Sequence, residues 1–300
     1  MTRFQLEQLR TFAAVVEEGT LEAAARSLYV TPSAISQRLK AMEDAAGQIL
    51  LQRTSPVRPT TAGEAVLRFA RQMRQLEWDA RQELGGSDAT PSSSIPLVVN
   101  ADSLSTWFLS ALASLPSDLG ACFELHREDE QHSAQLLRTG AVMAAVTATP
   151  EPVQGCSVEA LGSLRYRAVA SPGYVRRWWP DGTELVAASQ APVVDFDRKD
   201  DLQAGFFRTV TGADLAAPRH YVPSSGEFAQ AIRLGLGWGL LPEQQCVADL
   251  RSGDLVELAP GNPVDVSLYW QRWKIDSPVL NQLTDAVRAT ASRQLRQPGA

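Results

Sequence analysis

The sequence predicts an α/β protein whose two parts are joined by a long helix. The first 60 residues hold short helical stretches and one short pair of strands. Residues 61–84 repeat apolar positions at helical spacing without interruption. From residue 95 onward, short apolar runs alternate with amphipathic stretches, which is the βαβ rhythm of mostly parallel sheets. A length of 300 residues fits about two domains.

Residues 20–46 have the pattern of two short helices joined by a tight turn. Thr20 can cap the first helix, and Thr31 followed by Pro32 fits the start of the second. One face of each helix is apolar or small, with Leu21, Ala24, Ala25 and Leu28 in the first and Ile35, Leu39 and Met42 in the second. The opposite face of the second helix is polar and lacks acids. This layout is typical of a helix-turn-helix that reads DNA, and an αα-hairpin with a solvated face is the alternative.

The flanking segments extend this unit to residues 1–60. Apolar residues recur every three positions ahead of it and predict a supporting helix, at Leu6, Leu9, Phe12 and Val15. Behind it, residues 49–53 and 57–60 predict two short strands around a turn at 54–56. A hairpin in this place is a wing, so we expect Arg53 and Arg58 near the DNA backbone or minor groove.

The long helix predicted at residues 61–84 has an apolar seam with alternating spacings of four and three. The seam consists of Ala62, Val66, Phe69, Met73, Leu76 and Ala80. A heptad pattern of this kind favours pairing with a second helix, and Val66, Phe69, Met73 and Leu76 are the predicted dimer interface. The alternative is a helix that lies on its own domain. We assign residues 61–86 to this linker, and residues 87–94, rich in serine, to a hinge.

Residues 95–300 are predicted to form one two-lobed domain resembling periplasmic binding proteins. Lobe I would comprise about 95–163 and 268–300, and lobe II about 164–267. The predicted strands cover 95–101, 122–126, 141–146, 164–170, 192–196, 219–223, 238–241 and 264–273, with helices between them and a final helix at 278–295. Such folds bind ligands at the carboxyl ends of their strands.

Composition limits the possible functions. The net charge is −6, but residues 23–74 carry eight basic and three acidic side chains, which suits a DNA-binding module on an acidic body. No apolar run is long enough to span a bilayer, and the N-terminus has no signal-peptide core, so we expect a cytoplasmic protein. The three cysteines and three histidines lack metal-like spacing. Because no nucleophile motif or phosphate-binding glycine loop is present either, we expect neither an enzyme nor a cofactor.

These motifs together resemble the LysR-type transcriptional regulators. The matching stretch runs from residue 6 to about 65 and includes TLEAAARSLYVTPSAISQRLKAMEDAA and RPTTAG. Three further segments, GQILLQRTSPVRPT, VVNADSLSTWFLSAL and APVVDFD, resemble the branch that regulates basic-amino-acid export, the ArgP/LysG type. Leu51 stands where many family members have Phe, and that branch shares the leucine.

The resemblance implies that the second helix of the pair enters the major groove of double-stranded DNA. The expected DNA contacts on this helix are Ser33, Ser36, Gln37, Arg38 and Lys40. Their chemistry agrees, because Gln reads adenine edges, while Arg and Lys read guanine or hold phosphate. The resemblance also implies a homodimer or homotetramer, with RNA polymerase as a further partner.

The resemblance places a small effector, lysine or arginine, between the lobes near the first strand-to-helix turn. Asn100, Asp102 and Ser103 form that turn, where helix-start N–H groups suit an α-carboxylate. Asp102 could bind the α-ammonium or only cap the helix. Of Glu128, Asp129, Glu130, Asp195 and Asp197 we expect two in the cleft. The remaining candidates are Trp107, which could equally belong to the core, and Thr147 and Ser225 at other strand ends.

Two alternatives remain at this point. A regulator of another branch would sense an acidic or aromatic effector, and a cleft lined by Arg165 or Arg167 in place of carboxylates would favour it. A solute-binding protein would share the two-lobed fold, but the absent signal peptide and the helix pair argue against it.

Overall fold

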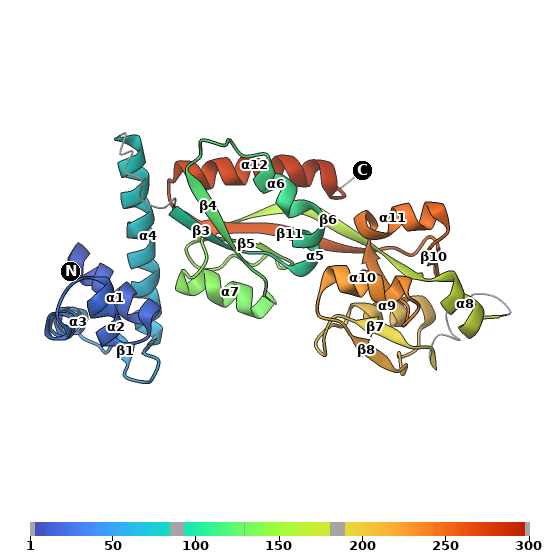
Figure 1. Ribbon diagram of the computed structural model, residues 1–300, viewed down its shortest axis with the longest axis horizontal. Coiled ribbons are helices and arrows are strands. Elements are labelled where there is room, and N and C mark those ends of the chain that lie inside the picture. The colour runs from blue at the N-terminus through green and yellow to red at the C-terminus, as the bar shows by residue number, and fades with distance from the viewer. Residues whose placement is uncertain (1–3, 85–92, 129, 181–189, 298–300) are drawn as a thin grey trace.

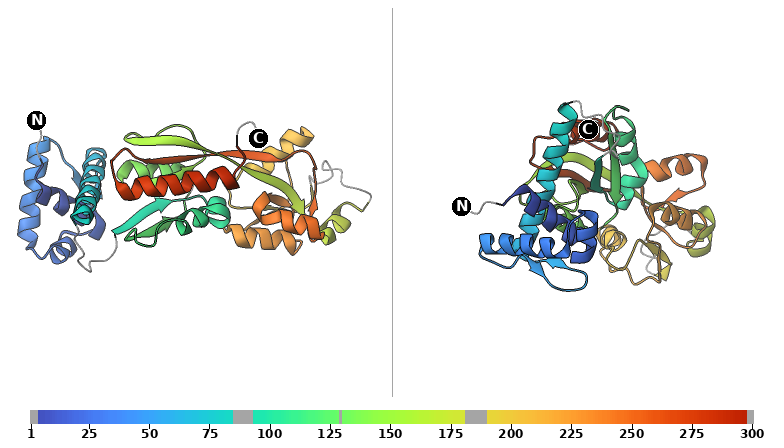
Figure 2. Two further views of the ribbon diagram at one scale, coloured as in Figure 1. Left: turned by 90° about the horizontal axis from the view of Figure 1, so that it is seen from above. Right: turned by 60° about the vertical axis from the view of Figure 1, so that its left-hand side comes forward.

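The structure is a computed structural model that describes residues 4–84, 93–128, 130–180 and 190–297. The molecule is elongated: a small helical domain occupies one end, α4 stands beside it, and a two-lobed α/β domain extends from α4 to the other end (Figures 1 and 2). The predicted fold class is therefore confirmed. No helix in the described ranges is both long and apolar enough to cross a membrane.

The N-terminal domain is a winged helix-turn-helix. Its elements are α1 (Leu6–Glu18), α2 (Leu21–Ser27), α3 (Pro32–Ala46), β1 (Leu51–Gln52) and β2 (Arg58–Pro59). Thr20 and Thr31 cap α2 and α3 as expected, since each hydroxyl accepts from a backbone N–H at 3.1 and 3.2 Å. The predicted apolar stripes meet in one core, with Phe12, Ile35 and Met42 fully buried. The two wing strands pair antiparallel.

The linker helix α4 (Thr61–Glu83) presents three different faces. Leu67 and Ala70 are buried against the N-terminal domain, and the buried pair Gln75 and Asp79 lies on another side of the helix. Side chains of the predicted seam remain partly accessible, with Phe69 exposed to 44% and Leu76 to 37%. Val66 and Met73 are half-buried and pack against the N-terminal core. The helix thus lies on its own chain and still offers an apolar face to a partner.

Lobe I is built around the parallel strands of the main sheet. Its elements are β3 (Ser93–Val98), β4 (Ala121–His126), β5 (Ala144–Thr147), α7 (Glu130–Thr139), α12 (Pro278–Gln294) and a helix of three segments, α5 (Ala101–Ser103), η1 (Leu104–Phe108) and α6 (Leu109–Ala113). β3 pairs in parallel with both β4 and β5. Because β3 begins at Ser93, the predicted hinge of 87–94 extends two residues too far; its first six residues lie outside the described ranges.

The prediction of mostly parallel sheets is wrong for the strands that connect the lobes. The main sheet has the order β10-β6-β11-β5-β3-β4, with β9 also on β6. β11 (Val264–Trp273) pairs antiparallel with β5 and β6, and β6 (Cys156–Ala170) pairs antiparallel with β9 and β10. The physical reason is that β6 leads from lobe I into lobe II and β11 returns. The β6–β11 register shifts between Leu268 and Tyr269, near Gly162, and this irregularity lies where the predicted lobes meet.

In its described residues, lobe II completes the fold with a small parallel pair of strands and four short helices. Its elements are β7 (Val193–Asp195), β8 (Arg219–Tyr221), β9 (Gly239–Pro242), β10 (Val256–Glu257), α8 (Pro172–Trp178), α9 (Leu202–Thr211), α10 (Ser225–Arg233) and α11 (Glu243–Ser252). One large apolar cluster runs from lobe I into lobe II and includes Trp270 and Trp238.

Candidate DNA-binding and effector-binding sites

The outer face of α3 carries the polar side chains expected to read DNA. Ser33, Ser36, Gln37 and Lys40 are all exposed, whereas Ile35, Leu39 and Met42 are buried behind them. Pro32 at the helix start and Thr31 as its cap fix where this face begins. The face therefore presents one amide, one cation and two hydroxyls, a set that can bond base edges and phosphates.

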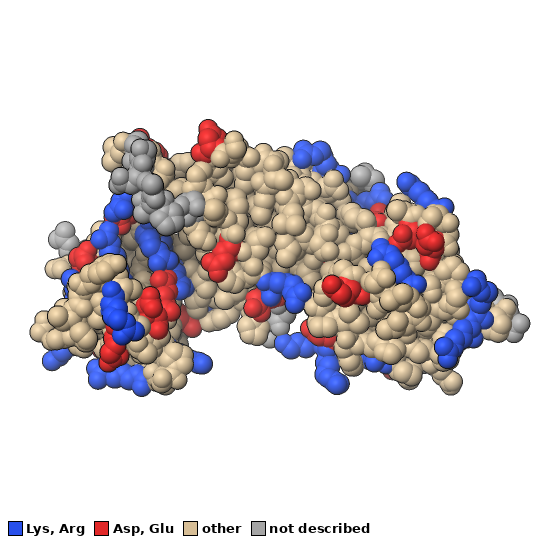
Figure 3. Space-filling model, viewed as in Figure 1, with Lys and Arg blue, Asp and Glu red and all other residues tan. Residues whose placement is uncertain are grey.

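Arg38 differs from the other candidates on α3, because its guanidinium turns back toward α1. Nη1 donates to Thr11 Oγ1 at 3.1 Å and lies 3.6 Å from Glu7 Oε2. In this arrangement Arg38 ties α3 to α1. Arg53 and Arg58 are exposed on the wing, and Figure 3 shows basic side chains along the lower edge of this domain.

A cavity of about 560 Å³ lies between the two lobes. Its lining includes four carboxylates, Asp102, Glu128, Asp197 and Asp200, and two cations, Arg127 and Lys199. Asn100, Tyr166, Phe196, Gln203 and Pro242 are among the other lining residues. Acidic groups therefore outnumber basic ones around a space large enough for a free amino acid.

Asp102 joins the two lobes at this cavity. Its Oδ2 accepts from the Tyr166 hydroxyl and its Oδ1 from the Ser225 hydroxyl, both at 2.7 Å. The helix cap is Asn100, whose Oδ1 accepts from the Ser103 N–H at 2.8 Å, so the alternative in which Asp102 only caps the helix is wrong. Burial raises the pKa of the Asp102 carboxyl above its ordinary value, although the two hydroxyl donors oppose that shift.

The facing wall in lobe II is shaped by Asp200. Its carboxylate accepts from the backbone N–H groups of Phe196 and Leu202 at 2.9 and 3.0 Å, and from the Gln203 amide at 3.1 Å. These bonds hold the turn before α9, which carries Asp197 and Lys199 into the lining. The Arg127 guanidinium from lobe I lies 5.9 Å from the centre of the Phe196 ring. A negative wall in lobe II thus faces a cation from lobe I.

Several predicted effector residues lie in the core and do not line the cavity. Ser103 and Trp107 are buried on the inner side of their helix, and Trp107 stacks edge-on against Phe108. Thr147 is buried and accepts from Gln271. Asp195 is buried inside lobe II and pairs with Arg219. Thr147 ends β5 and Asp195 ends β7, whereas Ser103 and Trp107 lie in the helix after β3, and none of these four buried side chains lines the cavity.

The other predicted residues divide as follows. Asn100, Asp102, Glu128 and Asp197 line the cavity, and Ser225 reaches it through its bond to Asp102. Asp129 lies outside the described residues, and Glu130 begins α7 but its side chain is not described. Arg165 and Arg167 do not line the cavity, because Arg165 binds Asp265 in a bidentate pair and Arg167 binds Glu243 and Glu257.

Among the polar residues of the site, Arg127, Tyr166, Lys199, Asp200 and Gln203 escaped the sequence analysis. Arg127 directly follows the predicted strand 122–126 and could have been included on the same grounds as Glu128. Tyr166 sits in the middle of the long strand β6, where the strand-end rule does not look. Lys199 and Asp200 belong to the turn before α9, whose conformation no periodicity predicts, and Gln203 lies in the first turn of that helix.

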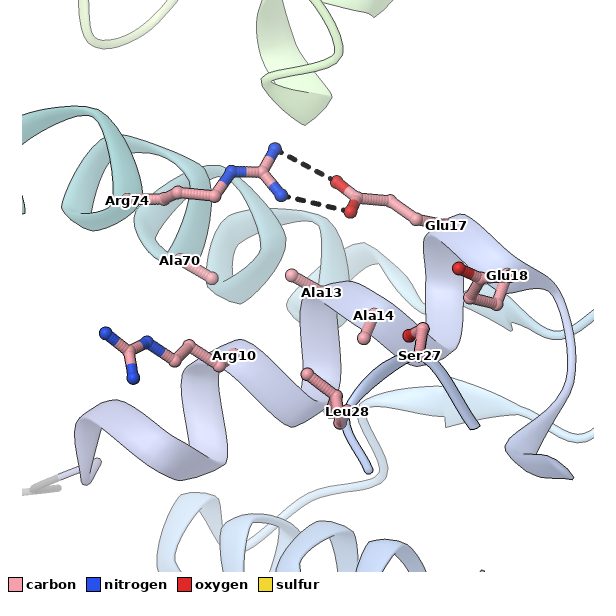
Figure 4. Close-up of a pocket in the computed structure, with 9 residues that line it drawn as sticks. All are labelled: Arg10, Ala13, Ala14, Glu17, Glu18, Ser27, Leu28, Ala70 and Arg74. Atoms are coloured by element: carbon pink, nitrogen blue, oxygen red, sulfur yellow. Dashed lines mark hydrogen bonds and ion pairs between the residues drawn. The ribbon is translucent and has the colours of Figure 1, made fainter. Parts of the chain in front are cut away.

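A smaller cavity of about 280 Å³ lies in the N-terminal domain, where α1, the end of α2 and α4 meet (Figure 4). Its floor is apolar, with Ala13, Ala14, Leu28 and Ala70. Its rim carries charges, and Figure 4 shows Arg74 of α4 bonded to Glu17 of α1 through two hydrogen bonds. This contact joins α1 to the linker helix.

A winged helix-turn-helix with a polar outer helix, joined by a long helix to two lobes around a cavity, defines a ligand-responsive DNA-binding regulator. Two family models match: the bacterial regulatory helix-turn-helix protein of the lysR family over residues 6–64, and the LysR substrate binding domain over residues 97–292. The chain belongs to the LysR family of transcriptional regulators. It is accordingly a DNA-binding regulator that responds to a small molecule, and not an enzyme.

Similar proteins cover almost the whole chain. The lysine export transcriptional regulatory protein LysG of Corynebacterium glutamicum is 41% identical, with 96% of this chain and 98% of that protein covered. The crystal structure of ArgP from Mycobacterium tuberculosis has a TM-score of 0.89 at 44% identity, over 96% of this chain and 98% of that one. Full-length LysG of C. glutamicum with bound effector Arg has a TM-score of 0.84 at 40% identity, over 98% and 100%. The predicted branch resemblance is therefore confirmed.

Proposed function

We propose that this regulator senses a basic amino acid, arginine or lysine, in the cavity between its lobes, and that it controls a gene for basic-amino-acid export. The observation that carries the proposal is the Asp102 carboxylate, which lies at the cavity between the lobes with its oxygens held by Tyr166 and Ser225. A carboxylate placed there favours a cationic ligand, because an unpaired buried charge is costly.

The remaining charges of the cavity fit the other ends of such a ligand. Arginine and lysine each carry an α-carboxylate, an α-ammonium and a distal cation. Arg127 and Lys199 supply positive charge for the carboxylate, while Asp197, Asp200 and Glu128 supply negative charge for the second cation. An acidic effector would bring two carboxylates into a lining with four, so electrostatics disfavour it.

The relatives support the same ligand class and target. The LysG protein of C. glutamicum is described as a lysine export regulator, and its structure contains Arg as bound effector. We transfer both the ligand class and the export function to this chain as a proposal. We further propose that two copies associate through the exposed face of α4 and that RNA polymerase is the partner at the promoter.

Isothermal titration of the full-length protein with arginine and citrulline tests the ligand class. Citrulline has almost the shape of arginine but lacks the guanidinium charge, so it is a matched control. We expect arginine and lysine to bind and citrulline to bind at least tenfold more weakly. A ligand at 100 times its Kd stabilises the folded state by about 2.7 kcal/mol, so a rise in Tm gives an independent readout. Equal affinity for citrulline or glutamate would overturn the proposal.

A further inference from the structure

The linker helix α4 is bound to lobe I of its own chain through charges placed at helix ends. At the C-terminus of α7, Arg68 Nη1 donates to the Arg138 carbonyl at 3.1 Å, and Arg71 Nη1 donates to the Thr139 carbonyl at 3.3 Å. Carbonyls in the last turn of a helix have no partner within the helix and form the negative end of its dipole. The two guanidiniums therefore bind where α7 offers free acceptors.

An acid makes the complementary contact at the other lobe I helix. The Asp79 side chain of α4 is buried, accepts from the Gln75 amide at 3.0 Å and lies near Ser277, the residue that precedes α12. The start of α12 is the positive end of that helix, so an acid suits this place. Cations at one helix end and an acid at the other fix the register of α4 on lobe I.

The backbone of α7 allows this close contact because Gly140 ends the helix. Gly140 has a φ of +73°, which favours glycine, and a Cβ there would lie 3.0 Å from the Arg68 Cα. The side chains of Glu64 and Gln135 add a hydrogen bond of 3.0 Å across the same interface. The contact between α4 and α7 is therefore close enough to transmit a displacement.

Arg71 also bonds to the DNA-binding domain. Its Nε donates to Glu17 Oε1 of α1 at 3.2 Å while its Nη1 holds the Thr139 carbonyl of lobe I. The side chain is only 14% exposed. Arg74 binds the same glutamate at 3.0 and 3.2 Å (Figure 4), and among the described residues Glu17 is its hydrogen-bond partner. Within the same ranges, Arg68 donates to two lobe I carbonyls, those of Arg138 and Gln154.

We propose that Arg71 is the positioning residue through which lobe I sets the orientation of the DNA-binding domain. One planar guanidinium binds an acceptor on each domain, Glu17 of α1 and the Thr139 carbonyl of α7. Movement of the α7 end therefore displaces α1 through this side chain. The part of this proposal that concerns effector response rests on the proposed function. The mechanical part, that the bridge couples the two domains, stands without it.

The test compares Arg71→Met with Arg74→Met in the full-length protein. Both variants remove one cation from α4 and weaken the hold on Glu17, which loses one hydrogen bond in Arg71→Met and two in Arg74→Met. Only Arg71→Met also breaks the bond to lobe I. The first readout is the ratio of operator Kd without and with saturating arginine. We expect this ratio to collapse to within twofold of one in Arg71→Met and to stay near the wild-type ratio in Arg74→Met. Arginine affinity by calorimetry should change less than twofold in both.

The second readout needs no effector. Amide hydrogen exchange in the ligand-free protein should rise at the end of α1 and around residues 138–142 together in Arg71→Met, and only in α1 in Arg74→Met. Arg71→Lys keeps the charge, but its single ammonium group cannot bind both acceptors as the planar guanidinium does. This variant should therefore retain the wild-type Tm and still lose the effect of arginine on operator affinity. A wild-type response in Arg71→Met, or identical exchange in the two variants, overturns the proposal. If wild-type protein does not bind arginine, the proposed function fails, and hydrogen exchange still decides on Arg71.

Discussion

Asp102 of lobe I and Ser225 of lobe II are joined by a hydrogen bond of 2.7 Å in which the serine hydroxyl donates to Oδ1. Gln245 extends this contact, because its amide donates to Ser225 at 2.9 Å and to Ser105 of lobe I at 3.0 Å. The lobes are therefore hydrogen-bonded to each other at the cavity edge through their own side chains. An effector that binds Asp102 enters an existing network between the lobes and changes its geometry.

Replacing Asp102 by Asn removes the negative charge but keeps the size of the side chain, so it tests the contribution of the charge to effector binding. The amide keeps one acceptor for Ser225 or Tyr166, so Tm without ligand should stay close to that of the wild type. Affinity for arginine and lysine should fall at least tenfold, about 1.4 kcal/mol, in a calorimetric titration. Asp118→Asn, at an exposed carboxylate that does not line the cavity, is the control and should leave the affinity unchanged. Wild-type affinity in Asp102→Asn would mean that the cations are bound by other acids.

Effector affinity should depend on pH through Asp102. Burial raises the pKa of this carboxyl, and the charge of Asp200 adds to the effect. Binding a cation requires the ionised form, so affinity should fall as the pH is lowered through the raised pKa, which lies above the ordinary 3.8. In the ligand-free protein the sign is opposite: this group favours folding at low pH, and that contribution is lost as the pH rises through the raised pKa. Asp102→Asn should remove this pH dependence of the affinity.

The exposed seam of α4 should hold two copies together. Phe69→Asp combined with Leu76→Asp puts carboxylates on the accessible apolar face and should yield monomers by light scattering, with weakened operator binding. Met73 is unsuitable for this test because it packs against the N-terminal core. Gln82→Asp adds a charge to the same helix away from the seam and should leave assembly unchanged. An intact oligomer in the double variant would place the interface elsewhere.

Substitutions on α3 and the wing should sort into three effects. Gln37→Ala should reduce discrimination between operator and random DNA, while Lys40→Ala and Arg53→Ala should weaken binding to both and reduce its salt dependence. Arg38→Ala should instead lower Tm, because its guanidinium joins α3 to Thr11 of α1. Fluorescence anisotropy at several salt concentrations measures the first two effects. A salt dependence unchanged by Lys40→Ala would remove that residue from the interface.

Local signals in the sequence were sufficient where packing follows from periodicity. The stripe of Ile35, Leu39 and Met42 predicted α3 and its polar face, and the bounds of β11 agree with the predicted strand. The direction of β6 and β11 could not be predicted, because apolar runs do not encode whether a strand pairs parallel or antiparallel. The seam of α4 was only partly informative, since its residues are shared between the N-terminal core and an open face.

The cavity was harder to predict than the fold because it depends on which way each side chain points. Asp195 ends a short strand, as a ligand-binding acid would, yet all three residues of β7 are buried and the carboxylate meets Arg219. Asp102 lies in the short helix after β3 and Asp197 in the loop after β7, and both line the cavity. Tyr166 completes the Asp102 site from a position 64 residues away in sequence, a pairing visible only after β6 has been placed.

Because β6 and β11 each run through both lobes, the two parts of the molecule differ in modularity. The DNA-binding unit and the helix α4 that completes its core form one continuous segment, so they can be exchanged together for those of a relative by a single junction. Neither lobe is continuous, and a chain cut near residue 267 would lose α12 and the end of β11 from lobe I. Chimeras with altered effector specificity therefore have to exchange the whole segment 93–297 or change side chains within it.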